Sequence, residues 1–278
     1  MLPADVDAAT ELIRGNEWGV RREWLEFATS QLACAPLVAD ADGEIVGTGV
    51  GTGNGLVGWI GTIFIAPDRR GQGLGRALTQ AIIDRLESAG CRTLVLVATT
   101  EGRRLYERMG FDVRTRYRIL EAAGLAPDAQ DASAGAHASS AVRPFDPGDL
   151  DALAALDREA TGEDRGHAIR RLATPEAARV VARPDGGIDG FVIRAPWGGG
   201  ATVARSRDAA LELITARRLA AGPTGRTRVG LLQENRLGLK RLREAGFQAQ
   251  WSAPRMIRGE PLTWRPGWIW GQFNHAMG

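Results

Sequence analysis

The hydrophobic pattern of the N-terminal half opens with two helical stretches and a strand hairpin. Apolar side chains recur at helical intervals over residues 5–16 and again over residues 21–30. Two short apolar stretches follow at 37–40 and 45–51, separated by the sequence ADGE. Gly43 in this turn suits the positive φ that a tight hairpin requires, so we predict an antiparallel pair of strands.

The rest of this half predicts alternating strands and helices. An apolar strand is expected at 59–65, a helix at 74–89, a buried strand at 93–98 and a helix at 102–109. A final strand follows Phe111. Each helix is followed by a glycine, the residue that most readily adopts the left-handed conformation that ends helices. The order predicts an α/β domain on a mixed sheet.

The sequence EAAGLAPDAQDASAGAHASS, residues 121–140, interrupts this pattern. Its residues are mostly small or polar, with no aromatic side chain, so they cannot bury enough surface to offset the entropy cost of ordering the chain. We predict a linker here, which separates a domain at 1–120 from a second domain at 141–278.

The two halves repeat each other weakly. TTEGRRLYERMGF, starting at Thr99, is matched by NRLGLKRLREAGF, starting at Asn235, and PADVDAATEL at Pro3 is matched by PGDLDALAAL at Pro147. Two matches in the same order indicate a duplicated domain. The second copy has AVRPF before its proline, whereas the first begins almost at Pro3. We therefore expect the first copy to lack most of its opening strand, either through a truncated start or because something else covers that edge.

Composition and charge narrow the function classes without selecting one. The 278 residues are 44% hydrophobic and 24% charged, which is typical of a globular protein with a sizeable core. The net charge of +2 is too small to favour a nucleic acid partner. Cys34 and Cys91 form no CxxC pair, which argues against a metal site or a disulfide framework.

Membrane and export signals are also missing from the sequence pattern. The longest apolar stretch, 56–66, is too short to span a bilayer. The N-terminal residues carry several acidic side chains and no apolar signal core. We therefore expect a cytoplasmic protein without a membrane partner.

The chemistry is concentrated in IFIAPDRRGQGLGRAL, residues 63–78. A strand that ends at Ala66-Pro67 leads through a basic turn and closely spaced glycines directly into a helix. Glycines expose backbone N–H groups, and a helix start adds unpaired N–H donors and the positive end of the helix dipole. Such a corner binds a diphosphate. Because one exposed helix-end charge contact contributes only about 0.3–1 kcal/mol, several converging N–H groups are needed.

Two other nucleotide motifs do not fit this loop. It lacks the Gly-Lys-Ser/Thr ending of a Walker A loop, and its glycines are spaced GxGxG rather than the GxGxxG of a Rossmann fold. A Rossmann domain also needs an acidic residue roughly twenty positions further on, and 89–91 has none. The pattern that fits is RxxGxG, formed by Arg70, Gly73 and Gly75.

These residues, together with LYERMGF after the next strand, resemble the GNAT superfamily of CoA-dependent N-acetyltransferases. The resemblance covers the strand, loop and helix at 59–90, the strand at 93–98 and the helix at 103–111. RMIRG at 255–259 makes the second half similar to the degenerate YitH-like domain of tandem GNAT proteins. The resemblance implies an α/β fold of tandem GNAT-like (acyl-CoA N-acyltransferase) domains, each a mixed, mostly antiparallel sheet flanked by helices.

The resemblance also implies a function and assigns site residues. It implies an N-acetyltransferase that moves an acetyl group from acetyl-CoA, as co-substrate, to a primary amine by direct attack in a ternary complex. Backbone groups of Ile63 and Ile65 would hold the pantetheine arm and the thioester carbonyl, where a backbone N–H stabilises the oxyanion. Tyr106 would be the general acid that protonates the departing thiolate, since a phenol with a pKa of about 10 is protonated at neutral pH. The expected cofactor-binding residues are Ile63, Phe64, Ile65, Arg70, Gly71, Gln72, Gly73, Leu74, Gly75, Arg76, Thr99 and Gly102.

Two features depart from the family pattern. Thr99 occupies a position where the family often has an asparagine, which weakens the prediction of a side-chain contact with pantetheine there. No carboxylate lies at 59–62, on the strand where some relatives carry the general base. Glu17 is the most suitable alternative, ahead of Glu23 and Glu26. A water chain or a group from the second domain is equally open.

The second half lacks both functional elements of the first. Its sequence ATVARSRDAALELI has no glycine loop, and Leu242 stands where the first copy has Tyr106. We expect this half not to bind CoA productively and instead to cover the acceptor cleft and shape specificity. We assign no role to His167 or His275. Most of its tryptophans are expected to be core or strand anchors, with a pocket lining as the alternative; they include Trp251, Trp264, Trp268 and Trp270.

The sequence therefore supports one leading function and two alternatives. The leading hypothesis is acetyl transfer to a small-molecule amine. The alternatives are a non-catalytic CoA-binding sensor or interaction module, and an acetyltransferase of peptide or protein N-termini. The pattern indicates no metal site, and it leaves a homodimer open.

Overall fold

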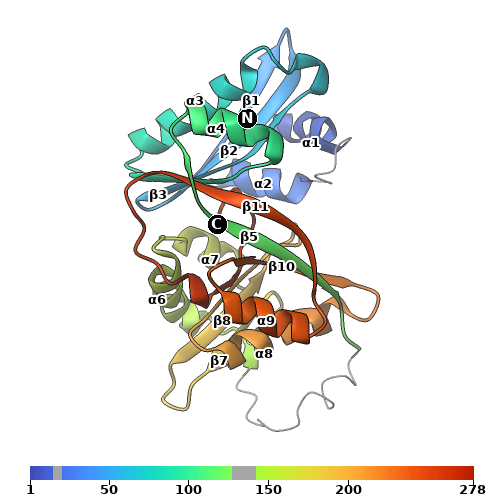
Figure 1. Cartoon of the computed structure of the whole chain (residues 1–278), viewed down its shortest axis with the longest axis vertical. Helices are drawn as coiled ribbons and strands as arrows, with labels where there is room; N and C mark the ends of the chain where they lie inside the picture. The colour runs from blue at the N-terminus through green and yellow to red at the C-terminus, as the bar shows by residue number, and fades with distance from the viewer. Residues whose placement is uncertain (15–20, 127–141) are drawn as a thin grey trace. The chain divides into compact units, whose positions relative to one another are not determined.

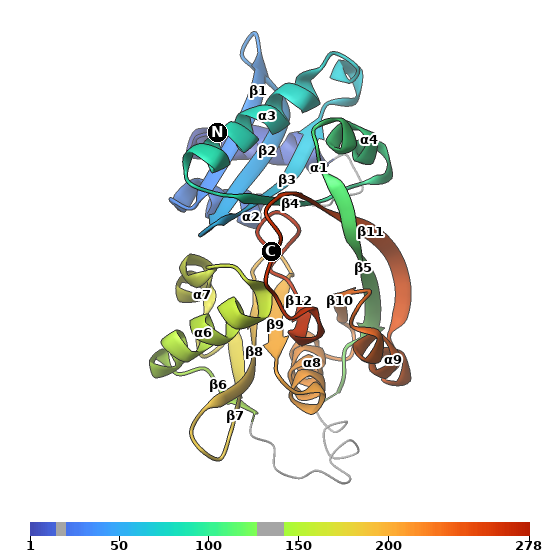
Figure 2. The ribbon, with the colours of Figure 1, turned by 60° about the vertical axis from the view of Figure 1, so that its left-hand side comes forward.

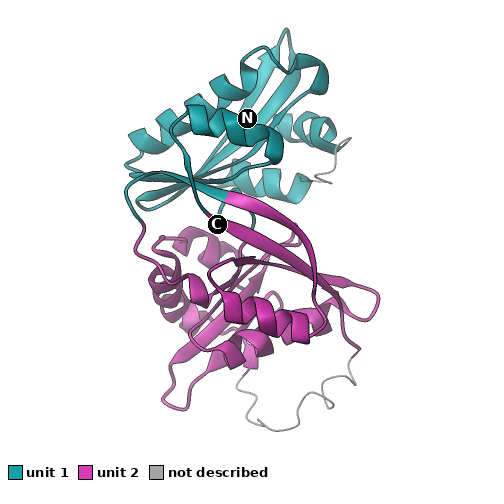
Figure 3. Ribbon diagram, in the orientation of Figure 1, with its two compact units in different colours: residues 1–114, 255–261, 274–278 teal, residues 115–254, 262–273 magenta. Residues whose placement is uncertain are grey.

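The computed structural model describes residues 1–14, 21–126 and 142–278, and the ribbon is shown in two orientations (Figures 1 and 2). The chain forms two compact units (Figure 3). Unit 1 comprises Met1–Arg114, Arg255–Pro261 and Asn274–Gly278, and unit 2 comprises Thr115–Pro254 and Leu262–Phe273. Two short segments from late in the sequence are therefore part of the unit that the N-terminal half forms.

Unit 1 contains the glycine loop and the elements that flank it. In chain order these elements are the 3-10 helix η1 (Pro3–Asp5), α1 (Val6–Arg14), α2 (Arg22–Ser30), β1 (Cys34–Ala41), β2 (Glu44–Asn54), β3 (Val57–Ile65), η2 (Pro67–Arg69), α3 (Leu74–Ser88), β4 (Thr93–Val97) and α4 (Thr100–Arg108). The strand β5 (Asp112–Ala123) begins in unit 1 and continues into unit 2, and β11 (Gln248–Gly259) ends in unit 1.

The strands of unit 1 are hydrogen-bonded in the order β1-β2-β3-β4-β11. Neighbours are antiparallel except for β3 and β4, which run parallel. The late strand β11 joins through Arg255, which pairs with Val97, and continues to Gly259, which pairs with Thr93. The sheet is mixed and mostly antiparallel, which confirms the predicted class.

Helices cover both faces of the unit 1 sheet. α3 and α4 lie on one face, and α1 and α2 lie on the other (Figures 1 and 2). Strand glycines allow α3 to approach closely: a Cβ on Gly51 would lie 2.6 Å from Ile82 Cγ2, and one on Gly58 would lie 2.9 Å from Leu86 Cδ1. Side chains at these positions would push the helix outward, so the glycines of β2 and β3 fix where α3 lies.

The core beneath α3 and α4 includes one residue from the late strand. Met256 of β11 is 0% exposed, and fully burying a side chain of this size contributes about 1.5–3 kcal/mol. This segment is therefore an integral part of unit 1. The buried residues of the cluster are Ile60, Ile82, Ile83, Leu86, Cys91, Leu94, Leu96, Ala98, Tyr106, Met109, Phe111 and Met256.

The local turn signals of the sequence are confirmed in unit 1. Asp42 and Gly43 have φ values of 56° and 87°, as the tight turn between β1 and β2 requires. Gly90 follows α3 with φ 92°, and Gly110 follows α4 with φ 85°. Both adopt the left-handed conformation expected after a helix.

Unit 2 repeats the helix-and-sheet arrangement. Its elements, after β5, are β6 (Val142–Pro144), η3 (Pro147–Asp149), α6 (Leu150–Thr161), α7 (Gly166–Leu172), β7 (Ala178–Ala182), β8 (Ile188–Arg194), β9 (Gly200–Ala204), α8 (Arg207–Ala221), β10 (Arg226–Leu232), α9 (Arg236–Glu244), the first part of β11, η4 (Pro266–Trp268) and β12 (Ile269–Gly271). A five-stranded sheet has the order β12-β9-β8-β7-β6. β5 and β10 belong to the seven-stranded sheet that also contains β1 to β4, and β5 lies between β11 and β10 there. α6 and α7 lie on one side of β7, β8 and β9, and α8 lies on the other (Figure 2).

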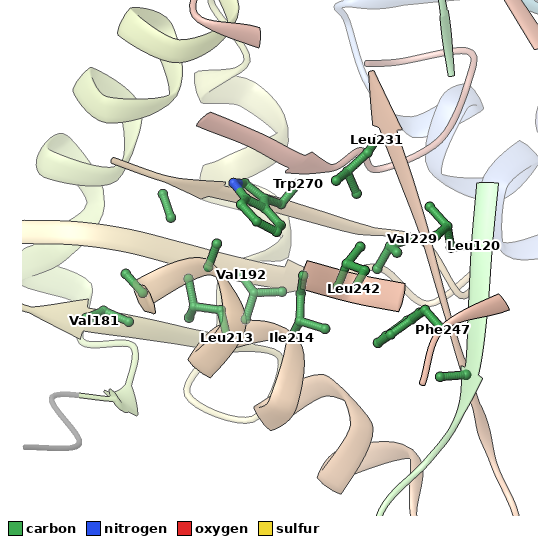
Figure 4. Close-up of a cluster of buried hydrophobic side chains, with 14 residues drawn as sticks. Leu120, Val181, Val192, Leu213, Ile214, Val229, Leu231, Leu242, Phe247 and Trp270 are labelled. Carbon is green, nitrogen blue, oxygen red and sulfur yellow. The ribbon is translucent and has the colours of Figure 1, made fainter. Parts of the chain in front are cut away.

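A second apolar core lies against α8 (Figure 4). Leu213 and Ile214 of α8 pack there with Val192 of β8 and Leu242 of α9. Trp270 belongs to the same cluster and is 1% exposed, which confirms the prediction of a core anchor for this tryptophan. Of the others, Trp251 lies on β11 and is 49% exposed, and the guanidinium groups of Arg205 and Arg265 lie 4.8 and 4.7 Å from the centre of the Trp268 ring.

The predicted linker begins later than its composition suggested. β5 runs to Ala123, so residues 121–123 are a strand rather than part of a linker. Ala123 pairs with Arg226 and Glu121 pairs with Arg228. The Glu121 carboxylate accepts hydrogen bonds from both arginines. The neighbouring strand supplies the backbone partners that the local composition cannot reveal. Residues 127–140 of the predicted linker lie outside the described residues, so a linker there stays a proposal.

The sequence repeat corresponds to matching helix starts. The Asp5 carboxylate accepts from the backbone N–H of Leu2 before α1, and Asp149 accepts from that of Asp146 before α6. Thr99 caps α4 through its hydroxyl, which accepts from Gly102 N–H at 3.1 Å. In the same way, Asn235 Oδ1 accepts from Gly238 N–H at 3.0 Å at the start of α9. The two halves thus share local architecture as well as sequence.

Candidate active site

The strands β3 and β4 separate where the glycine loop begins. Their parallel pairing runs from Val57 with Thr93 to Ile60 with Leu96, and no further pair follows. β3 nevertheless continues to Ile65. Beyond Ile60, therefore, the described pairing of β3 is with β2 only.

A β-bulge in β3 lies at this point of separation. The register with β2 shifts between Thr48 and Val50, and Thr62 has φ 55°, which is unusual for a β-branched residue. Two hydrogen bonds hold the bulge. Trp24 Nε1 donates to Thr62 Oγ1 at 2.9 Å, and Thr48 Oγ1 donates to the Thr62 carbonyl at 3.0 Å. The bulge re-aims the last residues of β3, and sequence reasoning missed it because the strand pattern itself is unbroken.

The backbone of Ile63 and Ile65 faces away from β2. Ala66 N donates to Val46 O at 2.9 Å, so these two residues form a hydrogen-bonded pair. Two residues earlier, Phe64 lies opposite Thr48 and belongs to the next pair of the same kind. In an antiparallel pair the residues that exchange hydrogen bonds alternate with residues that do not. Ile63 and Ile65 therefore direct their backbone N–H and C=O groups toward the side that β4 has left.

Arg70 connects the loop to the end of β3. Its Nε donates to the Ile65 carbonyl at 3.1 Å, which confirms that this carbonyl points to the open side of the strand. The guanidinium also lies 5.7 Å from the centre of the Phe64 ring. Phe64 is buried, and Arg70 is exposed. These two contacts thus hold the Arg70 side chain beside the end of β3.

The loop itself is open and is shaped by left-handed glycines. Gly71 has φ 78° and Gly73 has φ 84°. A Cβ on either residue would meet no heavy atom within 4 Å. The positions that side chains of residues 71 and 73 would occupy are therefore free of described protein atoms at this distance. Gln72, between the two glycines, is exposed.

The start of α3 presents backbone donors for which the described residues supply no hydrogen-bond partner. Its N-cap is Gly73, which has no side chain, and the first helical bond runs from Ala77 N to Gly73 O at 3.0 Å. The N–H groups of the first turn have no carbonyl four residues earlier to bind. They belong to Leu74, Gly75 and Arg76. This arrangement fits the sequence prediction of an anion corner.

The start of α3 lies beside the end of β3 and beside α4. A Cβ on Gly75 would lie 3.7 Å from Ile65 Cγ1 and 3.9 Å from Leu105 Cδ2. Because β3 and β4 are parallel, the segments that follow them emerge at the same edge of the sheet. Thr99 and Gly102, in the first turn of α4, are therefore at the same edge as the loop. The Thr99 hydroxyl accepts the capping bond and keeps its proton for donation.

Tyr106 is buried on α4. Its side chain is 9% exposed and packs edge-on against Phe111, with ring centroids 6.2 Å apart. A Cβ on Gly102 would lie 3.0 Å from the tyrosine ring, so the glycine provides room for it. Burial raises the pKa of the Tyr106 phenol to about 12. The phenol is therefore protonated at neutral pH, as a general acid must be.

The two described candidates for the general base, Glu23 and Glu26, are exposed. Glu17 lies outside the described residues. Glu23 and Glu26 lie on the exposed side of α2, whose Trp24 and Leu25 are buried. Arg22 Nη1 donates to Glu26 at 3.2 Å. The structure thus places these two carboxylates on a solvated helix face.

Sequence reasoning missed the contribution of Asn274–Gly278 to unit 1. Asn54, buried in β2, donates from Nδ2 to the Met277 carbonyl at 2.9 Å. A Cβ on Gly61 would lie 2.5 Å from Ala276 Cβ, so this glycine of β3 makes room for the segment. A glycine just before the bulge and a buried asparagine were the available signals. Burial lowers the pKa of His275 in this segment to about 4.

Arg255 is a second late residue inside unit 1. It is 1% exposed, and its guanidinium lies 5.4 Å from the centre of the Trp59 ring. The sequence marked it only as part of RMIRG. Its partner strand β4 is distant in the sequence, so no local pattern could place it.

The corresponding helix start of unit 2 is capped by a side chain. β9 leads to α8 through Ser206, whose hydroxyl accepts from Ala209 N–H at 3.2 Å. A helix start capped in this way has fewer free donors than the glycine start of α3. Leu242, at the position of Tyr106, is 0% exposed and packs in the core (Figure 4). Both observations support the prediction that this half lacks the loop and the acid.

Among the described residues, no helix is both long and apolar enough to cross a membrane. Nor does the described part of the chain bring together a group of histidine, cysteine, aspartate or glutamate side chains that could hold a metal ion.

Comparison with known proteins gives matches for both halves. The model of the acetyltransferase (GNAT) family matches residues 6–111, and the model of an acetyltransferase (GNAT) domain matches residues 153–271. A curated relative, the L-methionine sulfoximine/L-methionine sulfone acetyltransferase of Pseudomonas paraeruginosa, is 31% identical over 103 residues. That match covers 34% of this chain, and the chain spans 59% of the relative's length.

Solved structures share the fold over most of the chain. A protein of Pyrococcus horikoshii superimposes with a TM-score of 0.82 at 18% identity, covering 100% of this chain and 94% of that one. A tandem GNAT protein from the clavulanic acid biosynthesis pathway gives a TM-score of 0.60 at 15% identity, covering 93% and 96%. At these identities the likeness concerns the fold alone. With a GNAT match on each half of the chain, the protein belongs to the GNAT acetyltransferase family and carries two GNAT domains in tandem.

Proposed function

We propose that this protein transfers an acetyl group from acetyl-CoA to the primary amine of a small molecule. One observation carries the proposal: the glycine start of α3, the unpaired end of β3 and the buried Tyr106 helix all lie at one edge of the unit 1 sheet. The curated relatives act on small methionine derivatives, which supports a small acceptor.

The loop would hold the pyrophosphate of the donor. Backbone N–H groups from Gly71 to Arg76 would converge on it, with the Arg70 guanidinium beside them. Convergence matters because one helix-end contact is worth only about 0.3–1 kcal/mol when exposed. Ile63 and Ile65 would bind the pantetheine arm through their outward-facing backbone groups, and the Thr99 hydroxyl would donate to it.

The reaction would proceed by direct attack in a ternary complex. The amine lone pair attacks the thioester carbon, and an N–H at the end of β3 stabilises the charge on the carbonyl oxygen. The C–S bond then breaks, and the departing thiolate takes the proton of the Tyr106 phenol. Before the attack, the acceptor ammonium would lose one proton through Glu17, a water chain or a group from the second half of the chain. The second proton, which the nitrogen loses as the amide forms, would restore the Tyr106 phenol.

A second function, a non-catalytic CoA-binding module, is favoured by one observation. The structure gives neither Glu23 nor Glu26 a place away from solvent, and β3 carries no carboxylate. Such a module would keep the loop and bind acetyl-CoA without turning it over.

One experiment separates the two functions. Free CoA is followed with DTNB across a panel of small amines, amino acid derivatives and peptides, and acetyl-CoA binding is measured in parallel by calorimetry. Turnover with a small amine supports the enzyme. Binding of acetyl-CoA without turnover of any acceptor supports the module. Absence of both acetyl-CoA binding and turnover contradicts both functions. Turnover confined to peptides would move the acceptor class to peptide N-termini.

A further inference from the structure

A small basic cavity lies in unit 2, away from the helix start that corresponds to the glycine loop. It has a volume of about 30 Å³ and is bordered by the C-terminal half of α8 and by β7 and β8. Its charged lining residues are Arg179, Arg194 and Arg217, with Val192 and alanines between them. No acidic side chain is part of the lining. Figure 4 shows Val192 on the face of β8 that α8 covers.

Arg217 is the buried member of this group. It is 7% exposed. Its Nη2 donates to the Arg228 carbonyl at 2.9 Å, whereas its Nη1 is buried and has no hydrogen-bond partner among the described residues. A buried donor without an acceptor costs about 1–3 kcal/mol, more when it is charged. The position therefore favours an acceptor that the described protein atoms do not supply.

None of the three lining arginines forms an ion pair within the described part of the chain, although the Glu176 carboxylate, which is outside the lining, lies within electrostatic reach of Arg179. Arg179 Nη1 donates to the carbonyls of Pro175 and Ala178, and Arg194 Nη2 donates to the carbonyl of Glu176. These backbone bonds hold the two guanidinium groups in place without cancelling their charge. Burial, followed by the nearby charge of Arg194, lowers the pKa of Arg217 to about 10, so Arg217 remains charged at neutral pH.

The sheet is shaped to admit the buried guanidinium. A Cβ on Gly200 of β9 would lie 3.1 Å from Arg217 Cζ and 3.2 Å from its Nε. A larger residue would require the guanidinium to shift by a few tenths of an ångström. The glycine therefore keeps Arg217 against the sheet, beside the cavity.

We propose that this cavity binds one oxyanion group, a phosphate or a carboxylate, between Arg217, Arg194 and Arg179. The planar guanidinium fork matches both oxyanions and forms charge-assisted hydrogen bonds with them. The cavity exceeds the roughly 10–15 Å³ that a single water needs, and its size suits one small group rather than a nucleotide. The site is independent of the acetyl transfer proposed for unit 1.

The test uses the full chain and inorganic phosphate, at constant ionic strength maintained with sodium chloride. Equilibrium dialysis should show saturable phosphate binding, and thermal unfolding should show a matching rise in Tm. Arg217→Met should weaken phosphate binding at least tenfold. The control is Arg207→Met, which removes the same charge from the exposed start of the same helix and should bind phosphate as the wild type does.

Two further arms keep the result interpretable. If Arg217→Met does not fold, Arg194→Gln, a change at an exposed residue, should still weaken binding several-fold. Acetate in place of phosphate distinguishes a carboxylate preference from a phosphate preference. The proposal is overturned if neither anion binds saturably, or if the folded arginine variants bind as tightly as Arg207→Met.

Discussion

Arg70 donates from Nε to the backbone carbonyl of Ile65 over 3.1 Å, and this bond joins the glycine loop to the strand that precedes it. An arginine has five N–H donors, so one such bond fixes the guanidinium while leaving most of its fork for a ligand. The Arg70 guanidinium also lies 5.7 Å from the centre of the Phe64 ring. The arginine and the end of β3 are therefore positioned together.

The first prediction concerns this arginine. Arg70→Gln should raise the Kd for acetyl-CoA about tenfold, because a hydrogen bond to a charged group contributes about 1.5–3 kcal/mol and 1.4 kcal/mol corresponds to a factor of ten. The free energy of unfolding should change by less than about 1 kcal/mol, since the side chain is exposed. Arg69→Gln is the matched control, because Arg69 lies near Glu44 and Asp68 instead. Equal losses of affinity in both variants would contradict the assignment.

The second prediction concerns the general acid. Tyr106→Phe should lower kcat by about a hundredfold, within the range of 10²–10⁴ that general acid catalysis supplies, while acetyl-CoA affinity stays nearly constant. The ring and its packing against Phe111 are retained, so stability should change little. Tyr117→Phe, at the other tyrosine of the chain, should leave kcat unchanged.

The raised pKa of Tyr106 also leads to an expectation for the pH dependence of kcat. Burial raises its pKa from 10.0 to about 12, so the protonated form is favoured in the folded state. The acid should therefore remain available well above neutral pH, and Tyr106 should cause no fall of kcat between pH 7 and 10. The contribution of the Tyr106 phenol to the free energy of unfolding is fully present below pH 10 and is lost as the pH rises toward 12. A fall of kcat below pH 10 that Tyr106→Phe abolishes would be inconsistent with this account.

The third prediction tests the packing of the late segment on β3. Gly61→Ala should destabilise the protein by about 1–3 kcal/mol, the usual effect of overpacking, because its Cβ would lie 2.5 Å from Ala276 Cβ. Gly53→Ala in β2 is the control, since its nearest contact would be 3.7 Å away. Urea unfolding measures both. A loss of stability no greater for Gly61→Ala than for Gly53→Ala would show that the segment does not pack there.

Part of this architecture could be predicted from the sequence because its signals are local. The order of elements from β3 to α4, the turn at Gly43 and the glycine start of α3 all depend on residues close together in the chain. The helix that carries Tyr106 could be predicted for the same reason, since it follows β4 directly. The physical causes are periodicity, positive φ and helix capping, which need no distant partner.

The remainder depends on contacts between distant parts of the chain. Arg255 pairs with Val97, and Met277 accepts a hydrogen bond from Asn54. No local pattern specifies either partner. The end of β5 was misassigned as linker for the same reason, because its strand character depends on β10. The bulge at Thr62 was likewise invisible, since two side chains from other elements hold it.

The fourth prediction concerns the buried histidine. His275 has a pKa lowered by burial from 6.5 to about 4, so the folded state favours the neutral ring. The unfolded chain binds a proton first as the pH falls, so this histidine removes stability between pH 6.5 and 4. The loss should be on the order of a few kcal/mol. His275→Gln should flatten the pH dependence of unfolding in that window, and an unchanged slope would refute the argument.

The most direct measurement of the central claim is acetyl-CoA titration by calorimetry into the wild type, Gly73→Ala and Gly90→Ala. The two glycines lie at opposite ends of α3, with φ 84° and 92°, and a Cβ on either meets no heavy atom within 4 Å. Each alanine should therefore cost a similar backbone strain of about 1–2 kcal/mol. We predict binding to the wild type, at least tenfold weaker binding to Gly73→Ala, and unchanged binding to Gly90→Ala. Absence of binding to the wild type, or equal affinities of the two variants, would contradict the claim that this loop holds the donor.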